Sequence, residues 1–377
     1  MPTLRALTAA FAAVLLVLPP AHAQRRKKKD PNAFPPVIIR KKEKEQKDET
    51  QALPVLREPP AATVGDVERL TFLVSPLSGK GLLSQQTREA LRWLFSNSRG
   101  GSVLKLRAFV AGTGDVRRVQ EIVSETFTER KLNLPALTVI QAGALPLEGA
   151  QVVLEAMLAD RRAINEHGVA LFSAQRGTAR DPLGALDAAL RATGLDGGDV
   201  RRITCFVNSF DLSAAAAQQA RTSYPEAALN FVQPLRGALD DYAECEAVAR
   251  LKRPPSKRVL PVEPQPGQFA LATLVGPGRV AVSSTQMAFQ TEDKDLRLVY
   301  ERLGKALEGV GAGYKGVVFT RVYTVARSIA ERANKLRYEF HGQETAPSGV
   351  TLVCEGMLSP DAHVGIEAYA MVTEQRP

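Results

Sequence analysis

Hydrophobic and polar positions in the last third of the chain follow two periods in turn. Between Asp295 and Glu308 the apolar residues recur every three or four positions, which is the spacing of one buried helix face. Residues 279–284 and 317–325 are instead short runs rich in valine, a composition typical of strands. The pattern therefore predicts a strand, a helix and a strand. A second helix and two more strands follow, over 328–340, 350–354 and 364–372.

The same order of elements is predicted twice more upstream. In the second copy, strands and helices run over 168–174, 182–192, 202–208, 212–223, 228–233 and 242–249. In the first copy they run over 69–75, 85–95, 103–110, 116–128, 137–141 and 151–158. A strand–helix–strand–helix–strand–strand order predicts an α+β layer, with one mixed sheet and two helices on one of its faces. We expect three such units, at 66–160, 161–250 and 267–377, and a proline-rich linker at 251–266.

Residues 1–23 have the pattern of a cleaved signal peptide. Arg5 precedes an apolar run from Ala6 to Leu18, and Ala21-His22-Ala23 supplies the small residues of a cleavage site. The run is short for a hydrocarbon core of ~30 Å, and an uncleaved anchor remains the alternative. The expected location is the periplasm or the outside of the cell.

Residues 24–65 predict a disordered, basic and proline-rich tail, because such a composition buries too little apolar surface to fold. The chain has a net charge of +9, and residues 24–60 hold eleven Lys and Arg against six Asp and Glu. The rest is nearly neutral and shows no basic face interleaved with aromatics, so we expect no nucleic-acid partner. Two interpretations of the tail stay open. Residues 24–47 are attracted to an anionic envelope surface, or they form a solvated spacer.

The three cysteines, Cys205, Cys245 and Cys354, all lie in apolar, strand-like runs. A free cysteine in such a run behaves as a small hydrophobic residue. A Cys205–Cys245 bridge requires that their two strands be neighbours, and its redox state stays open. No Cys and His spacing typical of a metal site occurs, so we expect neither a metal nor another cofactor.

The repeated unit resembles the Rid (reactive-intermediate deaminase, YjgF) family. Leu303–Val322 and Leu190–Val207 resemble the family's helix, its Gly-rich turn and the strand that follows, and each last strand carries a Glu-Ala pair, as the family's closing strand does. The resemblance covers residues 66–375 as three units. It implies chorismate-mutase-like units whose sheets form a central barrel, with helices outside and ligand clefts between subunits. Three units in one chain then predict an intramolecular pseudo-trimer and a monomeric chain.

The glutamates of these Glu-Ala pairs, Glu155, Glu246 and Glu367, are the candidate catalytic residues. In the family this glutamate helps to place or activate water for the hydrolysis of enamines and imines. One interpretation gives the three carboxyls pKa values raised by burial, as acid–base groups need. The other makes them structural residues at a seam between sheets. The resemblance also makes Phe269, Ser283, Ser284 and Thr285 candidate ligand-binding residues, in the third unit.

The family's carboxylate-binding arginine, in a P-x-R-[ST]-x-V strand start, has no counterpart. Its position falls on Leu137, on Ala227 and on Gly349 or Val350. An aliphatic side chain cannot replace a charge-assisted double hydrogen bond. Arg236 and Arg321 are the cations considered as substitutes.

Three functions follow as hypotheses. The first is a catalytically impaired, Rid-like protein that binds a small metabolite or a protein partner at clefts between units. The second is an active imine or enamine hydrolase that uses the glutamates and a relocated cation. The third is a structural envelope protein that acts through its basic tail.

Overall fold

The computed structural model describes residues 56–112, 114–236, 242–263, 268–342 and 347–373. The chain divides into two compact units, Met1–Leu53 and Pro54–Pro377, and all described residues belong to the second. None of the helices described there is long and apolar enough to cross a membrane.

The first sheet has the strand order β16-β4-β3-β5-β2. Its strands and helices are β2 (Leu70–Val74), α1 (Leu83–Asn97), β3 (Ser102–Ala111), α2 (Val116–Glu129), β4 (Ala136–Ala142), β5 (Val152–Ala159) and β16 (Gly356–Met357). Strand β3 pairs with β4 in parallel and with β5 in antiparallel orientation, so the sheet is mixed.

The second sheet has the order β10-β11-β6-β9-β7-β8. Its elements are β6 (Val169–Thr178), α3 (Gly184–Ala192), β7 (Val200–Val207), α4 (Phe210–Ser223), β8 (Ala228–Val232), β9 (Tyr242–Arg250), β10 (Val259–Val262) and β11 (Ala272–Val275).

The third sheet has the order β1-β12-β17-β14-β15, and β13 also pairs with β17. Its elements are β1 (Ala62–Asp66), β12 (Arg279–Ser283), β13 (Gln286–Ala288), α5 (Asp293–Glu308), β14 (Val317–Thr324), α6 (Arg327–His341), β15 (Ser348–Val353) and β17 (Val364–Met371). Three short 3-10 helices cover Val67–Arg69, Gly197–Asp199 and Tyr314–Gly316. The expected α+β class, with mixed sheets and two helices for each, is confirmed.

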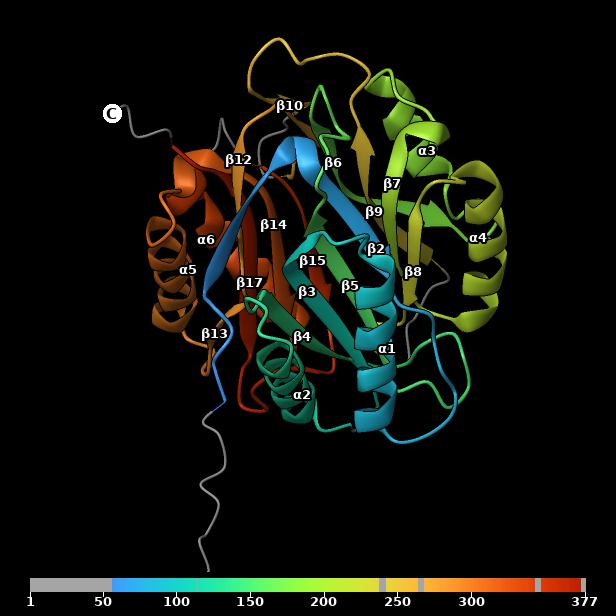
Figure 1. Cartoon of the computed structure of the whole chain (residues 1–377). Coiled ribbons are helices and arrows are strands. Elements are labelled where there is room, and N and C mark those ends of the chain that lie inside the picture. The colour runs from blue at the N-terminus through green and yellow to red at the C-terminus, as the bar shows by residue number, and fades with distance from the viewer. Residues whose placement is uncertain (1–55, 113, 237–241, 264–267, 343–346, 374–377) are drawn as a thin grey trace, which may run out of the picture. The chain divides into compact units, whose positions relative to one another are not determined.

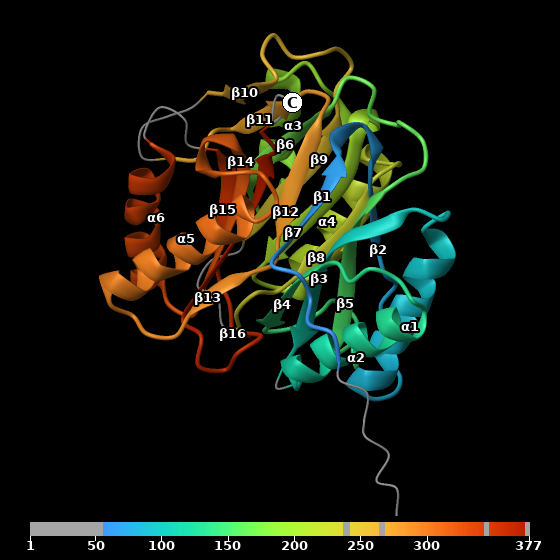
Figure 2. The ribbon, with the colours of Figure 1, turned by 60° about the vertical axis from the view of Figure 1, so that its left-hand side comes forward.

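Each sheet buries both of its faces. One face packs against its own two helices, which lie on the outside of the molecule (Figures 1 and 2). The opposite faces of all three sheets meet in two further apolar clusters, one around Phe72, Leu171 and Phe319 and the other around Phe109 and Phe206. Because both faces are buried, the strands contain few polar residues, and those that occur on the inner faces lie at the centre of the molecule.

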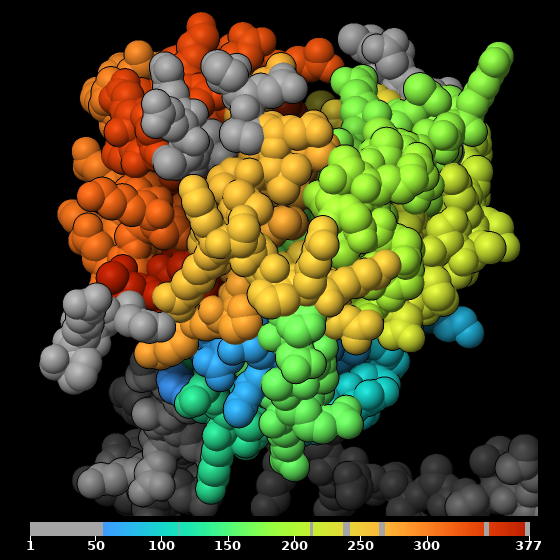
Figure 3. Space-filling model, turned by 90° about the horizontal axis from the view of Figure 1, so that it is seen from above, coloured from blue at the N-terminus to red at the C-terminus, as the bar shows by residue number. Residues whose placement is uncertain are grey.

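Three segments of the chain, with four strands among them, pair across the boundaries of the expected units. Strand β1 pairs with β12 of the third sheet, the hairpin of β10 and β11 extends the second sheet at β6, and β16 pairs with β4 of the first. Figure 3 shows the segment that contains β10 running between the green second-sheet elements and the orange third-sheet elements. Strand β1 thus begins within the expected tail, 24–65, and β10 lies within the expected linker, 251–266.

A disulfide joins Cys205 of β7 to Cys245 of β9. The two strands are neighbours and the two cysteines face each other in the pairing register, which is the condition that the sequence set for this bridge. Cys354 is a buried free thiol, and burial raises its pKa to about 12. All three sulfur atoms thus belong to the packed interior.

We predict that β1, and not the residues before 56, is needed for stability. A chain lacking residues 24–55 should keep its melting temperature within about two degrees, because their composition gives them no core to join. A chain lacking residues 24–66 also loses the ladder to β12 and the buried Ala62. A loss of about 2–3 kcal/mol should lower its melting temperature by roughly 4–12 °C. Circular dichroism melting of both chains measures this, and equal melting temperatures for the two would contradict it.

Candidate functional site

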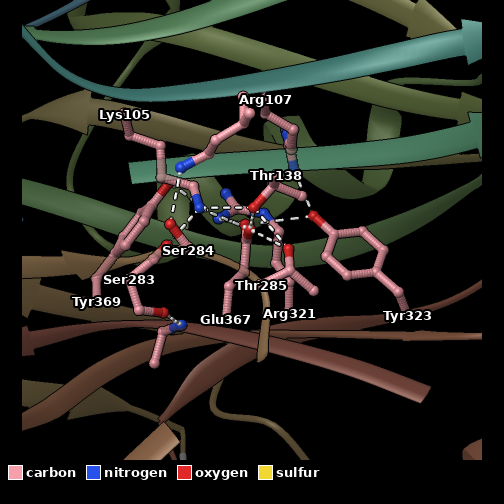
Figure 4. A network of polar contacts seen from close by, with 12 residues as sticks. Lys105, Arg107, Thr138, Ser283, Ser284, Thr285, Arg321, Tyr323, Glu367 and Tyr369 are labelled. Atoms are coloured by element: carbon pink, nitrogen blue, oxygen red, sulfur yellow. Dashed lines mark hydrogen bonds and ion pairs between the residues drawn. The ribbon is translucent and has the colours of Figure 1, made fainter. Parts of the chain in front are cut away.

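A cluster of charged side chains lies where the inner faces of the three sheets meet (Figure 4). The glutamates come from β5, β9 and β17, and the cations come from β3, β7 and β14. None of these side chains is more than 5 % exposed: Lys105, Arg107, Glu155, Arg202, Glu246, Arg321 and Glu367. The period of two along a strand places each of them on the same face as the apolar residues of the inner clusters.

Arg107 joins the first sheet to the second. Its Nε lies 2.7 Å from Oε2 of Glu155, and its Nη2 lies 2.7 Å from Oε1 of Glu246. Glu155 also accepts hydrogen bonds from Thr204 at 2.8 Å and from Asn230 at 2.5 Å, both in the second sheet. Every contact of this group therefore crosses, or lies beside, the seam between the two sheets.

Arg321 and Lys105 join the third sheet to the other two. The Nε of Arg321 lies 2.9 Å from Oε2 of Glu246, and its Nη1 lies 3.1 Å from Oε1 of Glu367. The Nζ of Lys105 lies 2.8 Å from Oε2 of Glu367 and 2.7 Å from Oγ1 of Thr138. Each pair of sheets thus shares at least one buried ion pair.

The carboxyl pKa values of Glu246 and Glu367 are lowered, which is the direction opposite to the one expected of raised acid–base groups. Burial by itself raises the pKa of Glu246, but Arg107, Arg321 and Arg202 outweigh it and hold that pKa well below its usual range. Burial likewise acts against Lys105 and Arg321 at Glu367, and the two cations bring its pKa to about 2. Burial also lowers the pKa of Lys105, and Glu367 offsets this only in part. These shifts favour the structural interpretation of the glutamates.

The strand pairing fixes where the family's arginine would stand. Arg107, Thr204 and Arg321 each face one of the three glutamates. On their other side they face, in order, Thr138, Asn230 and Val350 of β4, β8 and β15. The residue before each of these, at the arginine position, is Leu137, Leu229 and Gly349.

The expected position Ala227 is therefore wrong by two residues, and Gly349 is the third position instead of Val350. The chain from Pro225 to Leu229 is two residues longer than the chain from Pro135 to Leu137, so spacing from the proline did not give the register. The absence of an arginine holds at all three corrected positions.

The first cleft lies between the first and second sheets and has a volume of about 540 Å³. It is lined by Val74, Ser75, Pro76, Leu77, Pro146, Val153, Phe210, Ala214, Ala217, Arg221, Leu229, Asn230 and Phe231. Asn230 is bonded to Glu155, so the ionic cluster lies directly beneath this cleft. In the part of the chain that the structure describes, no carboxylate forms an ion pair with Arg221, which is exposed.

The second cleft, of about 400 Å³, lies between the second and third sheets. Phe269 lines it, beneath the guanidinium of Arg337 of α6 at 3.8 Å from the ring centre. Besides Arg337, the polar side chains that line it are those of Ser173, Gln175, Glu263, Gln268 and Asn334, and Gly349 contributes backbone. The Oγ of Ser173 accepts a hydrogen bond from the Gly349 N–H at 2.9 Å.

The serines and the threonine expected in a ligand pocket lie at the seam between the third and first sheets. Ser283 accepts a hydrogen bond from the Ala368 N–H at 2.9 Å, and Thr285 is bonded to Thr138 at 2.6 Å. Ser284 accepts one from the Leu137 N–H at 2.8 Å and donates one to the Pro60 carbonyl at 2.6 Å. Phe269 lies in a different cleft, so the structure does not bring the four candidate ligand residues together.

The considered substitutes for the arginine do not reach a cleft. Arg321 is buried in the ionic cluster, and the Arg236 side chain donates to the Gly143 carbonyl at 2.8 Å. The cations that line the clefts are Arg221 and Arg337, each on the second helix of its sheet. Sequence reasoning missed them because both lie among polar helix residues, where nothing separates a residue facing a cleft from one facing solvent. Among the described residues, no group of three or more His, Cys, Asp and Glu side chains is arranged to hold a metal ion.

No family model matches the chain, and no curated protein matches it. Among solved structures, a member of the YjgF/YER057c/UK114 family from Mycobacterium tuberculosis is 23% identical, over 28% of this chain and 86% of that one, with a TM-score of 0.24. A YjgF family member from Neisseria meningitidis is 14% identical, over 31% and 96%, with a TM-score of 0.24. A protein described as a putative endoribonuclease L-PSP from Entamoeba histolytica is 18% identical, over 31% and 98%, with a TM-score of 0.23.

We predict that the protein loses stability in acid through Glu367. Because the folded pKa of about 2 lies below the ordinary value of 4.5, this stabilisation is complete above pH 4.5 and is lost as the pH falls toward 2. The contribution is roughly 3 kcal/mol. Urea unfolding between pH 2 and 7 should show the loss, and it should be smaller in Glu367→Gln, whose side chain does not titrate. A variant of an exposed glutamate, Glu331→Gln, should follow the unmodified protein; an equal acid response of all three would contradict the prediction.

Proposed function

We propose that this chain is an exported, Rid-like protein whose three tandem units form an intramolecular pseudo-trimer. We further propose that it does not hydrolyse imines and that it binds its partners at the clefts between the sheets. One observation supports the proposed lack of imine hydrolysis: Leu137, Leu229 and Gly349 stand where the family has its arginine. Without a cation there, a cleft has no bidentate partner for a substrate carboxylate.

The state of Glu246 and Glu367 supports the same proposal. A general acid or base needs a pKa near the working pH and a reachable oxygen. Glu246 and Glu367 have lowered pKa values, and their oxygens are bonded to Arg107, Arg321 and Lys105. In this proposal the two glutamates join the units and do not act as catalytic residues.

The second candidate function, an imine or enamine hydrolase, has one observation in its favour. Arg337 reaches the second cleft, where Gly349 takes the arginine position and Ser173 and Asn334 lie close by. The third candidate, an envelope protein that acts through residues 24–47, depends on the tail alone, and the tail lies outside the described residues.

We predict that purified protein does not accelerate the hydrolysis of 2-aminoacrylate above the uncatalysed rate, because no cleft supplies an arginine at the family's position. The assay follows imine decay, with an arginine-bearing family member as the positive control. Turnover comparable to that control would contradict the proposal. In that case Arg337→Ala and Arg221→Ala would show which cleft is active.

We predict that the chain without residues 1–23 is a monomer of about 38 kDa, at ~110 Da per residue. The reason is that the inner faces of the three sheets already bury one another within a single chain. Multi-angle light scattering over a range of concentrations measures this mass. A stable trimer of chains would show that the inner faces need other copies.

A further inference from the structure

Strands β2, β6 and β12 occupy the same place in their sheets. The residue two positions after each glutamate pairs with one of these strands. Met157 faces Phe72 of β2, Val248 faces Leu171 of β6, and Tyr369 faces Val282 of β12. The residues two positions after Phe72, Leu171 and Val282 are Val74, Ser173 and Ser284. These three positions are therefore equivalent, and so are the strand edges that they belong to.

Two of these edges are covered by an extended segment from elsewhere in the chain. Strand β11 runs antiparallel along β6, and β1 runs antiparallel along β12. The N–H of Ser173 donates to the Leu271 carbonyl at 3.1 Å, and the N–H of Ser284 donates to the Ala61 carbonyl at 2.8 Å. The same two serine hydroxyls donate to the preceding carbonyls, of Ala270 at 2.5 Å and of Pro60 at 2.6 Å.

The two covering segments have similar sequences. In register they read Ala61-Ala62-Thr63-Val64 and Leu271-Ala272-Thr273-Leu274. Each places a small residue against the strand, then a threonine, then an aliphatic residue. The molecule thus contains two examples of one mode of strand addition, and these define the chemistry that an equivalent edge accepts.

The equivalent edge of the first sheet has no such cover among the described residues. Strand β2 pairs with β5 alone. Its Leu73 is half-buried, whereas Phe172 and Ser283 at the same place are buried. Asn165 covers the start of the edge, where its Nδ2 donates to the Leu70 carbonyl at 2.8 Å, so the open part runs from Phe72 to Val74.

The first cleft begins where this open edge ends, because Val74 and the three residues after it line the cavity. In the second cleft Phe269, two residues before Leu271 of the covering segment, lies beneath Arg337. The first cleft offers comparable partners to an aromatic ring, since Phe210, Phe231 and Arg221 line it.

We propose that the Phe72–Val74 edge and the first cleft together bind an extended peptide segment of a partner protein, by addition of a strand antiparallel to β2. The segment places an aromatic residue in the cavity, followed by small, threonine and aliphatic positions along the edge. Backbone hydrogen bonds to Phe72 and Val74 supply affinity, and the cavity supplies selectivity. This inference deepens the proposed binding at clefts and rests on it.

The probe is a fluorescent synthetic peptide with the sequence of residues 268–276, which is a natural occupant of the equivalent edge. Fluorescence anisotropy should show saturable binding to the full chain. Ala217→Trp fills the cavity and should weaken binding at least tenfold, whereas Ala215→Trp, on the exposed face of the same helix, should leave it unchanged. A peptide carrying proline at the Thr273 position lacks a strand N–H and should bind at least tenfold more weakly. This peptide keeps the test valid if Ala217→Trp does not fold.

Hydrogen exchange locates the peptide independently. The amides of Phe72 and Val74 should exchange more slowly when the peptide is bound, while the already paired strands β6 and β12 should not change. No binding to the unmodified chain, equal binding by the two tryptophan variants, or protection at another edge would overturn the strand-addition proposal. The light-scattering and imine assays test the proposed function separately. The proposed function and the strand-addition proposal can therefore fail independently of each other.

Discussion

The buried ion pairs at the centre are the interaction on which the rest of the structure depends. Removing charges from water costs several kcal/mol for each ion, and only close geometry with further hydrogen bonds offsets this. Among the described residues the cluster holds four cations and three glutamates, so its positive charges outnumber its negative charges by one. The hydroxyl of Tyr369 accepts from Arg321 at 2.9 Å, and the Ser283 carbonyl accepts from Lys105. A cluster so closely balanced fixes the three sheets in one arrangement, since a shift of any sheet leaves a buried charge without its partner.

In the function proposed above, these ion pairs give the glutamates the role of joining sheets. Glu246 accepts hydrogen bonds from the guanidinium groups of Arg107, Arg202 and Arg321, so both of its oxygens take part in contacts of the cluster. Leu137 and Gly349 also join sheets, because their backbone N–H groups donate to Ser284 and Ser173 of the neighbouring sheets.

Most helices and strands were predictable from the sequence because their apolar periods are local. Strand β1 was not predictable in this way. Its five residues follow prolines, and they form a strand because they pair with β12, more than two hundred positions later in the chain. The register of β8 was also missed, because a proline marks the turn and says nothing of its length. The basic residues of the cluster left a readable signal: Lys105 and Arg107 alternate within an apolar strand, where a charge has to find a buried partner. The sequence also singled out the partner glutamates, through the Glu-Ala pairs, but it did not show which cation each glutamate would meet.

The open first cleft follows from the side chains of α4. This helix places Ala214 and Ala217 toward the cleft and Ala216 and Ala220 into the sheet core, so it fills less volume than α2, which buries Val119, Ile122 and Phe127. The Cys205–Cys245 bridge lies in the core beneath α4 and closes a chain segment with a sequence separation of 40. In the chain-entropy model such a loop stabilises the fold by about 4 kcal/mol. The covalent link thus stabilises the second sheet on the face that α4 covers.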